Sequence, residues 1–249
     1  MRIEEIGSVE STNKYCEALD LAEVEDFTCY WALEQTAGIG QRGNHWHSAP
    51  GENLTFSLVL KPRGLAADRQ FRLTQALSLA VVDFFSIFNS QFSTFIKWPN
   101  DIYAAEGGER RPYKKICGTL VSARVQGGQV ATAICGIGLN VNERDFPDWV
   151  PNPTSLSLLT GRRYELRPLL EGLLGCIGRR CDALYAGRNL DEEYLARLLN
   201  LGVEARYKYK DEELTATITG VDAYGQLLLT AADGRRLVCG MKEVSQLAC

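Results

Sequence analysis

KWPND, residues 97–101, marks a corner in the chain, because it directly follows a β-branched and aromatic run that is typical of a strand. Pro99 fixes its own φ angle and biases the residue before it toward extended backbone, so a turn is expected directly after the strand. Lys97, Asn100 and Asp101 then point in different directions around the corner. Such a corner can display a phosphate-binding ammonium group beside a carboxylate that binds magnesium, although a solvated charged turn would have the same composition.

Strands are expected on both sides of this corner. Downstream, KICGTLVSARV (115–125) and QVATAICGIGLNV (129–141) are rich in β-branched residues, and QGG (126–128) between them is a hairpin turn. Upstream, FTCYWALE (27–34) and NLTFSLVLK (53–61) predict two further strands. The sequence therefore predicts a mixed sheet that contains hairpins.

Helices are predicted around this sheet. The segment 11–23 begins with good N-cap residues, and the segment 68–88 is apolar on most faces and contains neither Gly nor Pro. Apolar residues return at helical spacing over 166–187, and a shorter helix is expected over 190–200. The fold class is therefore α+β, with a mixed β-sheet flanked by helices.

The character of the sequence changes at about Leu201. VEARYKYK (203–210) alternates between outward charges and apolar or aromatic residues, and the following short strands are separated by YG and DG turns. We expect a small antiparallel barrel here. The chain thus divides into a main domain over 1–199 and a barrel domain over 200–249.

Composition excludes several classes of protein. The 249 residues carry a net charge of -4, which weighs against a general nucleic-acid binder. No apolar run reaches the length of a membrane span, so the cytoplasm is the expected compartment, without a membrane partner. The eight cysteines are scattered singly, which predicts free buried thiols. A zinc site is not expected, because C-x-x-C is missing and the two histidines, His45 and His47, only flank a tryptophan.

GIGQRG, residues 38–43, matches the glycine pattern of dinucleotide-binding loops. That pattern requires a following helix and, about twenty residues later, an acid. Here Pro50 and Gly51 interrupt the sequence, and the next strand ends in Lys61. The glycines either permit an irregular surface loop or expose backbone N–H groups that bind an anion without a helix.

Two further segments contain polar residues in apolar surroundings. Lys114 and Lys115 precede an apolar strand in KKICGTLV, and Asn140 and Asn142 interrupt the apolar run GIGLNVN. A polar side chain inside such a strand must find a partner or bear the cost of desolvation. These asparagines are therefore candidate ligand contacts.

Taken in order, five motifs resemble those of the biotin protein ligases, over nearly the whole chain. They are STN (11–13), GIGQRGNHW (38–46), KWPND (97–101), KKICG (114–118) and GIGLNVN (136–142). The resemblance implies a catalytic domain with a mixed sheet and an SH3-like C-terminal domain. Bifunctional members of the family also carry an N-terminal DNA-binding domain. Because this chain begins almost at STN, it resembles the short form, and DNA is not an expected partner.

The resemblance also implies the ligands. They are ATP, biotin and magnesium (Mg2+), and the protein substrate is a biotin carboxyl carrier protein domain of a biotin-dependent carboxylase. Biotin would be activated as biotinyl-5'-AMP and transferred to a lysine of the carrier. A homodimer is a candidate assembly, which the sequence itself does not fix.

Carried over by position, the resemblance assigns roles to individual residues. Lys115 is the catalytic residue, acting electrostatically on the biotin carboxylate and the α-phosphate, and Asp101 is a candidate magnesium ligand. The expected biotin contacts are Ser11, Thr12, Gln35, Gly38, Ile39, Gly40, Gln41, Lys115 and Gly118. The expected nucleotide contacts are Gln41, Arg42, Asn44, Trp46, Lys97, Asn100, Asp101 and Asn140.

The segment 38–46, called the glycine loop below, departs from the family pattern GRGRxGRxW. Ile39, Gln41 and Asn44 stand where that pattern has arginines, and Arg42 is the only arginine of the loop. We therefore expect this loop to retain the adenylate mainly through main-chain donors. Trp46, at the end of the loop, is expected to anchor it in the core rather than to touch biotin.

The sequence leaves two other functions open. A lipoyl or octanoyl protein ligase would share the fold and need a comparable lysine, although such enzymes usually lack KWPND. A non-catalytic biotin or nucleotide sensor would be favoured if the altered loop cannot support turnover.

Overall fold

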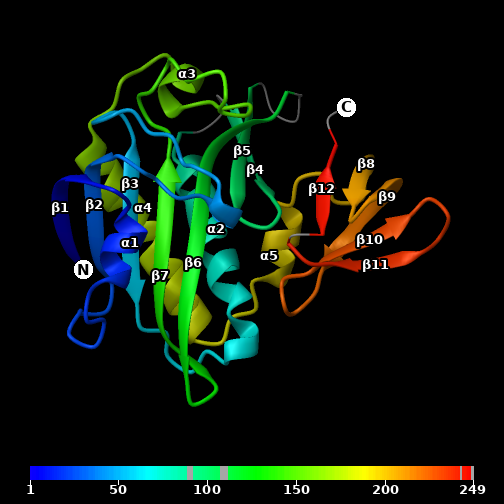
Figure 1. Ribbon diagram of the computed structural model, residues 1–249, viewed down its shortest axis with the longest axis horizontal. Helices are drawn as coiled ribbons and strands as arrows, with labels where there is room; N and C mark the ends of the chain where they lie inside the picture. Colours follow the sequence, from blue (N-terminus) through cyan, green and yellow to red (C-terminus); the bar gives the residue numbers. More distant parts are fainter. Residues whose placement is uncertain (89–91, 107–111, 242, 248–249) are drawn as a thin grey trace.

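The computed structural model describes residues 1–88, 92–106, 112–241 and 243–247. Two β-sheets organise the chain: a seven-stranded sheet with helices packed against it, and a five-stranded sheet made by the C-terminal residues (Figure 1). This confirms the predicted α+β class with a second, smaller β module.

The seven-stranded sheet has the order β1-β2-β3-β7-β6-β5-β4. Its strands are β1 (Arg2–Val9), β2 (Thr28–Gln35), β3 (Leu54–Leu60), β4 (Phe92–Lys97), β5 (Asp101–Glu106), β6 (Lys114–Gln126) and β7 (Gln129–Leu139). β1 pairs with β2 in parallel and the other neighbours pair antiparallel, so the sheet is mixed as predicted. The QGG turn joins β6 to β7, and Gly127 and Gly128 adopt the positive φ angles, 58° and 76°, that this turn requires.

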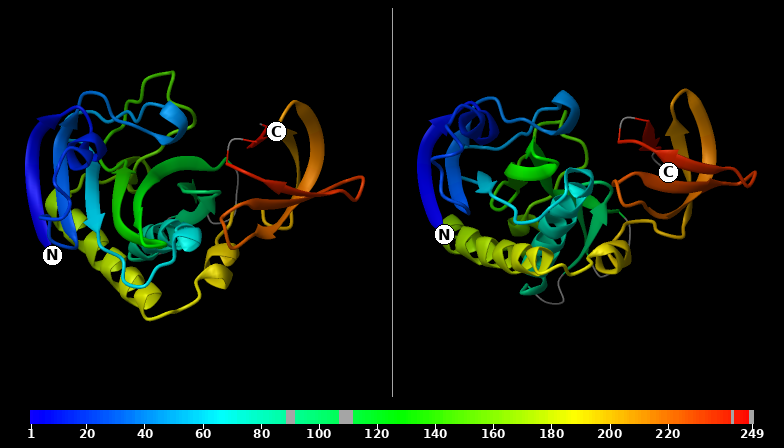
Figure 2. Two further views of the ribbon diagram at one scale, coloured as in Figure 1. Left: turned by 60° about the horizontal axis from the view of Figure 1, so that its bottom comes forward. Right: turned by 90° about the horizontal axis from the view of Figure 1, so that it is seen from below.

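The helices divide between the two faces of the large sheet. They are α1 (Thr12–Glu17), α2 (Phe71–Ser86), α3 (Leu156–Thr160), α4 (Leu166–Tyr185) and α5 (Asp191–Ala196), with 3-10 turns η1 (Gln41–Gly43) and η2 (Ala67–Arg69). α2 and α4 pack together along one face, and α1 lies on the other (Figure 2). The helix expected over 11–23 is too long, because α1 ends at Glu17. Beyond it, the Asp20 carboxylate accepts a hydrogen bond from the Ala22 N–H at 3.0 Å, a local turn that competes with helix.

Alternation along β2 and β3 shows what each face of the sheet contacts. Cys29 and Trp31 join the large hydrophobic core under α2 and α4, whereas Tyr30 joins a smaller cluster with α1. On β3, Leu58 points to the large core, and its neighbour Ser57 is buried on the α1 face. Polar side chains are thereby buried on the face opposite the two long helices.

A β-bulge in β6 determines which residues of KKICG reach that α1 face. Tyr103 pairs with Lys115 and Ile102 with Cys117, so Ile116 is an extra residue in β6. Ile116 and Cys117 are both 0% exposed and belong to the large core. The bulge therefore turns Lys115 and Gly118 toward the same, opposite face, although they are three residues apart.

The C-terminal sheet is antiparallel and has the order β11-β10-β9-β8-β12. Its strands are β8 (Glu204–Tyr209), β9 (Glu212–Val221), β10 (Leu227–Ala231), β11 (Arg236–Cys239) and β12 (Val244–Gln246). It lies beside the KWPND corner (Figures 1 and 2), where Trp98 Nε1 donates a hydrogen bond to the Gly225 carbonyl at 3.0 Å. Gly225 must lack a side chain, because its Cβ would overlap the Phe71 ring.

The described cysteines agree with the sequence prediction. Seven of them are buried as free thiols, and Cys249 lies outside the described residues. None of the helices in the described part of the chain combines the length and the hydropathy that a membrane crossing requires.

Removal of one buried hydroxyl tests how the KWPND corner is supported. Tyr194 is fully buried, and its hydroxyl donates to the Pro99 carbonyl at 2.8 Å. Tyr194→Phe leaves that buried carbonyl without its donor, so we expect the free energy of unfolding in urea to fall by about 1–2 kcal/mol. Tyr224→Phe, at a position 62% exposed, is the control and should leave stability unchanged. Equal stability of both variants would show that the hydroxyl does not support the corner.

Candidate active site

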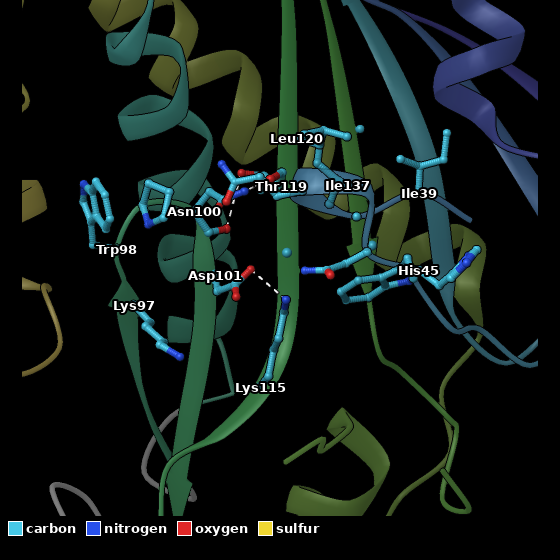
Figure 3. A pocket seen from close by; sticks show the side chains of 18 of the residues that line it. Ile39, His45, Lys97, Trp98, Asn100, Asp101, Lys115, Thr119, Leu120 and Ile137 are labelled. Atoms are coloured by element: carbon cyan, nitrogen blue, oxygen red, sulfur yellow. Dashed lines mark hydrogen bonds and ion pairs between the residues drawn. The ribbon is translucent and has the colours of Figure 1, made fainter. Parts of the chain in front are cut away.

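A cavity of about 330 Å³ opens on the α1 face of the large sheet and extends toward the C-terminal sheet. Figure 3 shows side chains from distant parts of the sequence that converge on it, with Lys115 and Asp101 side by side. The predicted site residues that line this cavity are Ser11, Thr12, Gln35, Ile39, Gly40, Gln41, Asn44, Trp46, Lys97, Asn100, Asp101, Lys115 and Gly118.

Gly38 and Asn140 do not line this cavity. Gly38 closes the glycine loop, because its carbonyl accepts the Trp46 N–H at 2.9 Å. Asn140 lines an adjoining cavity of about 430 Å³, which shares Lys115 and Trp46 with the first. The side chain of Arg42 lies outside what the structure describes.

An ion pair joins the two strands that border the cavity. Lys115 Nζ lies 2.8 Å from Asp101 Oδ1, and both side chains are about one quarter exposed, at 26% and 27%. The backbone of Lys115 is fixed on its other side: its N–H donates to the Asn152 carbonyl and its carbonyl accepts the Thr154 N–H, both at 2.8 Å. The backbone of the residue that carries this ammonium group is therefore held by hydrogen bonds at the edge of the cavity.

A second ammonium group stands nearby. Lys97 of β4 lies opposite Asp101 of β5 in the register of the sheet. The Nζ atom of Lys97 lies 3.4 Å from the Tyr103 hydroxyl. Burial lowers the pKa of Lys97, Asp101 acts against this shift and Lys115 adds to it. Burial, assisted by Asp101, raises the pKa of Tyr103 to about 12. Two cations beside one carboxylate favour the binding of an anion.

Backbone forms the floor of the cavity. Gly118 of β6 pairs with Gly138 of β7, and Gly136 lies two residues earlier on the same face. The Trp46 indole packs directly on this floor, because a Cβ at Gly138 would overlap it. Trp46 thus lies on the wall of the cavity and not in the core, where it was expected, and Lys115 Nζ is 5.3 Å from its ring.

A chain of buried polar groups forms one end of the cavity. The side-chain amide oxygen of Gln35, Oε1, accepts the Thr12 N–H at 2.7 Å and the Thr12 hydroxyl at 3.1 Å. The Ser57 hydroxyl reaches the Thr12 hydroxyl at 2.7 Å and the Asn13 side chain. Ser11 is 2% exposed beside them. These donors and acceptors are thus joined to one another by hydrogen bonds along the wall of the cavity.

The glycine loop forms a short hairpin with a 3-10 turn. Gly40 N–H donates to the Asn44 carbonyl, Ile39 bridges to His45, and the turn η1 spans Gln41–Gly43. Because no helix follows, the dinucleotide-loop interpretation is excluded by structure as well as by sequence. Gln41 Nε2 lies 3.2 Å from the Met241 sulfur, so the loop also contacts the C-terminal module.

Asn100 and Asn140 differ in the hydrogen-bonding groups that their side chains leave without a partner. The Asn100 amide donates to the Thr119 carbonyl and ties the corner to β6. The Asn140 amide donates to the Thr154 carbonyl at 2.9 Å, whereas its buried oxygen has no hydrogen-bond partner within the described residues. That oxygen is available to accept a hydrogen bond from a ligand.

Sequence reasoning did not single out several residues of the site. Gly136 and Gly138 stand in the quoted motif GIGLNVN, and their spacing of two residues, which puts both on one face of a strand, was the available signal. His47 Nε2 lies 2.6 Å from Glu143 Oε1 behind the glycine loop, although the two residues are 96 positions apart in the chain. No local pattern indicates such a pair. The side chains that the C-terminal module brings to the cavity, such as Val244, also had no signal.

Comparison with known proteins places this architecture. Residues 6–140 match the Biotin/lipoate A/B protein ligase family. The Bifunctional ligase/repressor BirA of Bacillus spizizenii is 30% identical over 234 residues, covering 91% of this chain and 68% of the relative. The Biotin--[acetyl-CoA-carboxylase] ligase of Mycobacterium tuberculosis is 27% identical over 221 residues, covering 87% of this chain and 77% of that protein.

A solved structure has the same fold. The biotin protein ligase from Aquifex aeolicus, in complex with biotin and ATP, matches with a TM-score of 0.78 and 23% sequence identity over 99% of both chains. The chain described here belongs to the biotin/lipoate A/B protein ligase family. The fold that the sequence motifs implied is therefore confirmed.

A substitution in the glycine floor tests its contact with the indole. The methyl group of Gly138→Ala would overlap Trp46, so we expect the free energy of unfolding to fall by about 1–3 kcal/mol, as in other overpacked sites. Gly7→Ala, in β1 where nothing lies within 4 Å, is the matched control. Adding Trp46→Ala to Gly138→Ala should relieve the penalty. A loss of stability that the second substitution does not relieve would contradict the assigned contact.

Proposed function

We propose that this protein is an ATP-dependent biotin protein ligase, which activates biotin as biotinyl-5'-AMP and transfers it to a lysine of a carrier protein. The observation that carries this proposal is the Lys115–Asp101 pair at the edge of a glycine-floored cavity, with the second ammonium group of Lys97 beside it. The family membership and the named relatives support it.

Biotin is assigned to the end of the cavity where Thr12, Gln35 and Ser57 are joined by hydrogen bonds. Its ring system carries both donors and acceptors, which Thr12, Gln35 and their neighbours can satisfy. The floor at Gly118, beside the Trp46 indole, has no side chain of its own, so a ring system can approach the backbone closely there. In this orientation the biotin carboxylate points toward Lys115.

The nucleoside part of ATP is assigned to the second cavity, and its phosphates to the boundary with the first cavity, which Lys97 and Asp101 line. Trp46 and Trp149 provide aromatic surface for the base, and the free oxygen of Asn140 provides an acceptor. Since Lys115 borders both cavities, the α-phosphate meets the biotin carboxylate at this ammonium group. Main-chain groups of the glycine loop are the expected contacts that retain the adenylate.

The reaction brings two anions together, and the cations make this encounter favourable. A carboxylate oxygen of biotin bonds to the α-phosphorus, and the bond to pyrophosphate breaks. The amine of the carrier lysine then attacks the acyl carbon, loses a proton, and AMP leaves. Lys115 and Lys97 stabilise negative charge and orient the reactants, without forming a covalent bond.

Magnesium fits this site only as a partner of the phosphates. Within the described residues there is no group of three or more side chains that could hold a metal, and Asp101 is the one candidate carboxylate at the cavity. A magnesium ion bound to ATP commonly uses one or two carboxylates. Asp101 would hold such an ion, which would shield the phosphate charges.

The protein substrate is a biotin carboxyl carrier domain of a biotin-dependent carboxylase. The five strands within 204–246 support a boundary between domains 1–199 and 200–249. Buried free thiols suit the reducing cytoplasm. The homodimer stays a prediction that sedimentation can test.

Mass spectrometry tests the proposed function. A carrier domain incubated with this protein, ATP, magnesium and biotin should gain the mass of one biotinyl group. Because the family also includes lipoate ligases, the same incubation with lipoate is the required comparison. Labelling by lipoate alone would reassign the substrate, and labelling by neither acid would contradict the proposed activity.

Lys115 is tested by biotin-dependent exchange of pyrophosphate into ATP. Lys115→Ala should lower the exchange rate by roughly 10²-fold or more, the loss seen when one oxyanion donor is removed. Its exposed neighbour allows a matched control, because Lys114→Ala removes the same charge away from the cavity. Near-normal exchange by the Lys115 variant would remove this residue from the mechanism.

The lowered pKa of Lys97 predicts an alkaline limit of activity. A lowered pKa means that the ammonium group loses its charge at a pH below the 10.5 of an unperturbed lysine. Therefore kcat/KM for ATP, which reports the free enzyme, should fall as pH rises through this range. In Lys97→Arg the guanidinium stays charged, so the decline should move to higher pH. The same alkaline limit in both proteins would show that another group titrates.

A further inference from the structure

A buried carboxylate lies directly behind the glycine loop. Glu143 is 3% exposed and is surrounded by donors: His47 Nε2 at 2.6 Å, the Ala49 N–H at 3.2 Å and the Asn53 amide. Because an ionised carboxylate only accepts hydrogen bonds, the ring nitrogen of His47 donates. A carboxylate this far from water requires such partners.

The donors all come from one segment, and the acceptor comes from another. The segment 47–53 leads from the glycine loop into β3, whereas Glu143 follows β7. Asn53 strengthens the connection, since its oxygen accepts the Val141 N–H at 2.9 Å. The end of the glycine loop is thereby fastened to the start of the segment that leads to Trp149.

The imidazole of His47 also shapes the second cavity. It packs edge-on against Trp149, with ring centroids 5.7 Å apart and an interplanar angle of 85°. Both rings line the cavity, together with Asn140. The preceding residue, Trp46, packs on the glycine floor. The hydrogen-bonded imidazole of His47 therefore positions two aromatic side chains: Trp149, which it contacts, and Trp46, which precedes it in the chain.

We propose that Glu143 is a positioning residue for the nucleotide. Through His47 it holds the end of the glycine loop and the Trp149 wall in register, although it lines neither cavity itself. This inference rests on the proposed function and adds a residue to it.

The composition of the loop explains why such an anchor matters here. Ile39, Gln41 and Asn44 cannot form ion pairs with phosphate, which leaves Arg42 as the one arginine of the loop and makes the placement of its backbone important. A backbone contact has a useful geometry only if the ends of the loop are fixed. Glu143 fixes one of these ends.

Glu143→Gln tests the proposal, with Glu52→Gln as the matched control. The glutamine of the first variant can keep its oxygen for the Ala49 N–H and the Asn53 amide, but its NH2 group then faces His47, so the imidazole no longer donates to a carboxylate and this charge-assisted bond is lost. Glu52 lies in the same segment, but its carboxylate pairs outward with Arg163 at 2.8 Å.

The readouts are the KM for ATP in pyrophosphate exchange and the dissociation constant for biotin alone. For Glu143→Gln we expect the KM for ATP to rise about tenfold, as for loss of a charge-assisted hydrogen bond, with biotin affinity within about twofold of the parent. Biotin affinity is spared because the bonds of Thr12 and Gln35 do not involve Glu143. The control should match the parent in both constants.

A pair of substitutions at His47 covers the case in which Glu143→Gln does not fold. His47→Leu removes the donor to Glu143, whereas His47→Gln retains an N–H that can replace it. The leucine variant should show the raised KM for ATP, and the glutamine variant should largely restore it.

Two results would overturn the inference. An unchanged KM for ATP in both Glu143→Gln and His47→Leu would show that the anchor does not act on the nucleotide. An equal loss of affinity for ATP and biotin would reduce Glu143 to a general structural role. Absence of biotin-dependent exchange in the parent protein is a separate result, which contradicts the proposed function itself.

Discussion

The ion pair between Lys115 and Asp101 is the interaction on which the rest of the site depends. Two backbone features create it: the turn at Pro99 begins β5 at Asp101, and the β-bulge at Ile116 rotates Lys115 out of the core. Without the bulge, regular alternation would turn Lys115 toward α2 and α4. The carboxylate balances the charge of the ammonium groups while no anionic ligand is bound, and an arriving anion can compete for them.

The two faces of the large sheet have different roles, because one carries the hydrophobic core and the other carries the candidate active site. Its face under α2 and α4 carries the continuous hydrophobic core, whereas the opposite face carries glycines, buried hydroxyls and the ion pair. A glycine-rich surface provides little packing energy of its own, so the indole of Trp46 covers it. A ligand with a flat ring can use the same surface. The glycine floor and the indole that covers it therefore come from different segments of the chain.

The parts of this structure that local pattern encodes were predictable. The β6–β7 hairpin, the long helix α2 and the alternating C-terminal strands follow from periodicity and turn residues. The edge strand β1 was missed, because RIEEIGSV is half exposed and alternates weakly. Most of the residues that the resemblance assigned position by position line one cavity. Contacts between distant segments, such as Trp46 on Gly138 or His47 with Glu143, have no local signal and required the structure.

Lys115 is proposed to lie where the two anionic reactants meet. A crystal structure of the protein with biotin and a non-hydrolysable ATP analogue would show whether it does. We expect Lys115 Nζ to turn from Asp101 and to contact both the biotin carboxylate and the α-phosphate, each within about 3 Å. If both ligands are bound and Lys115 contacts neither of them, Lys115 has no electrostatic role in the reaction.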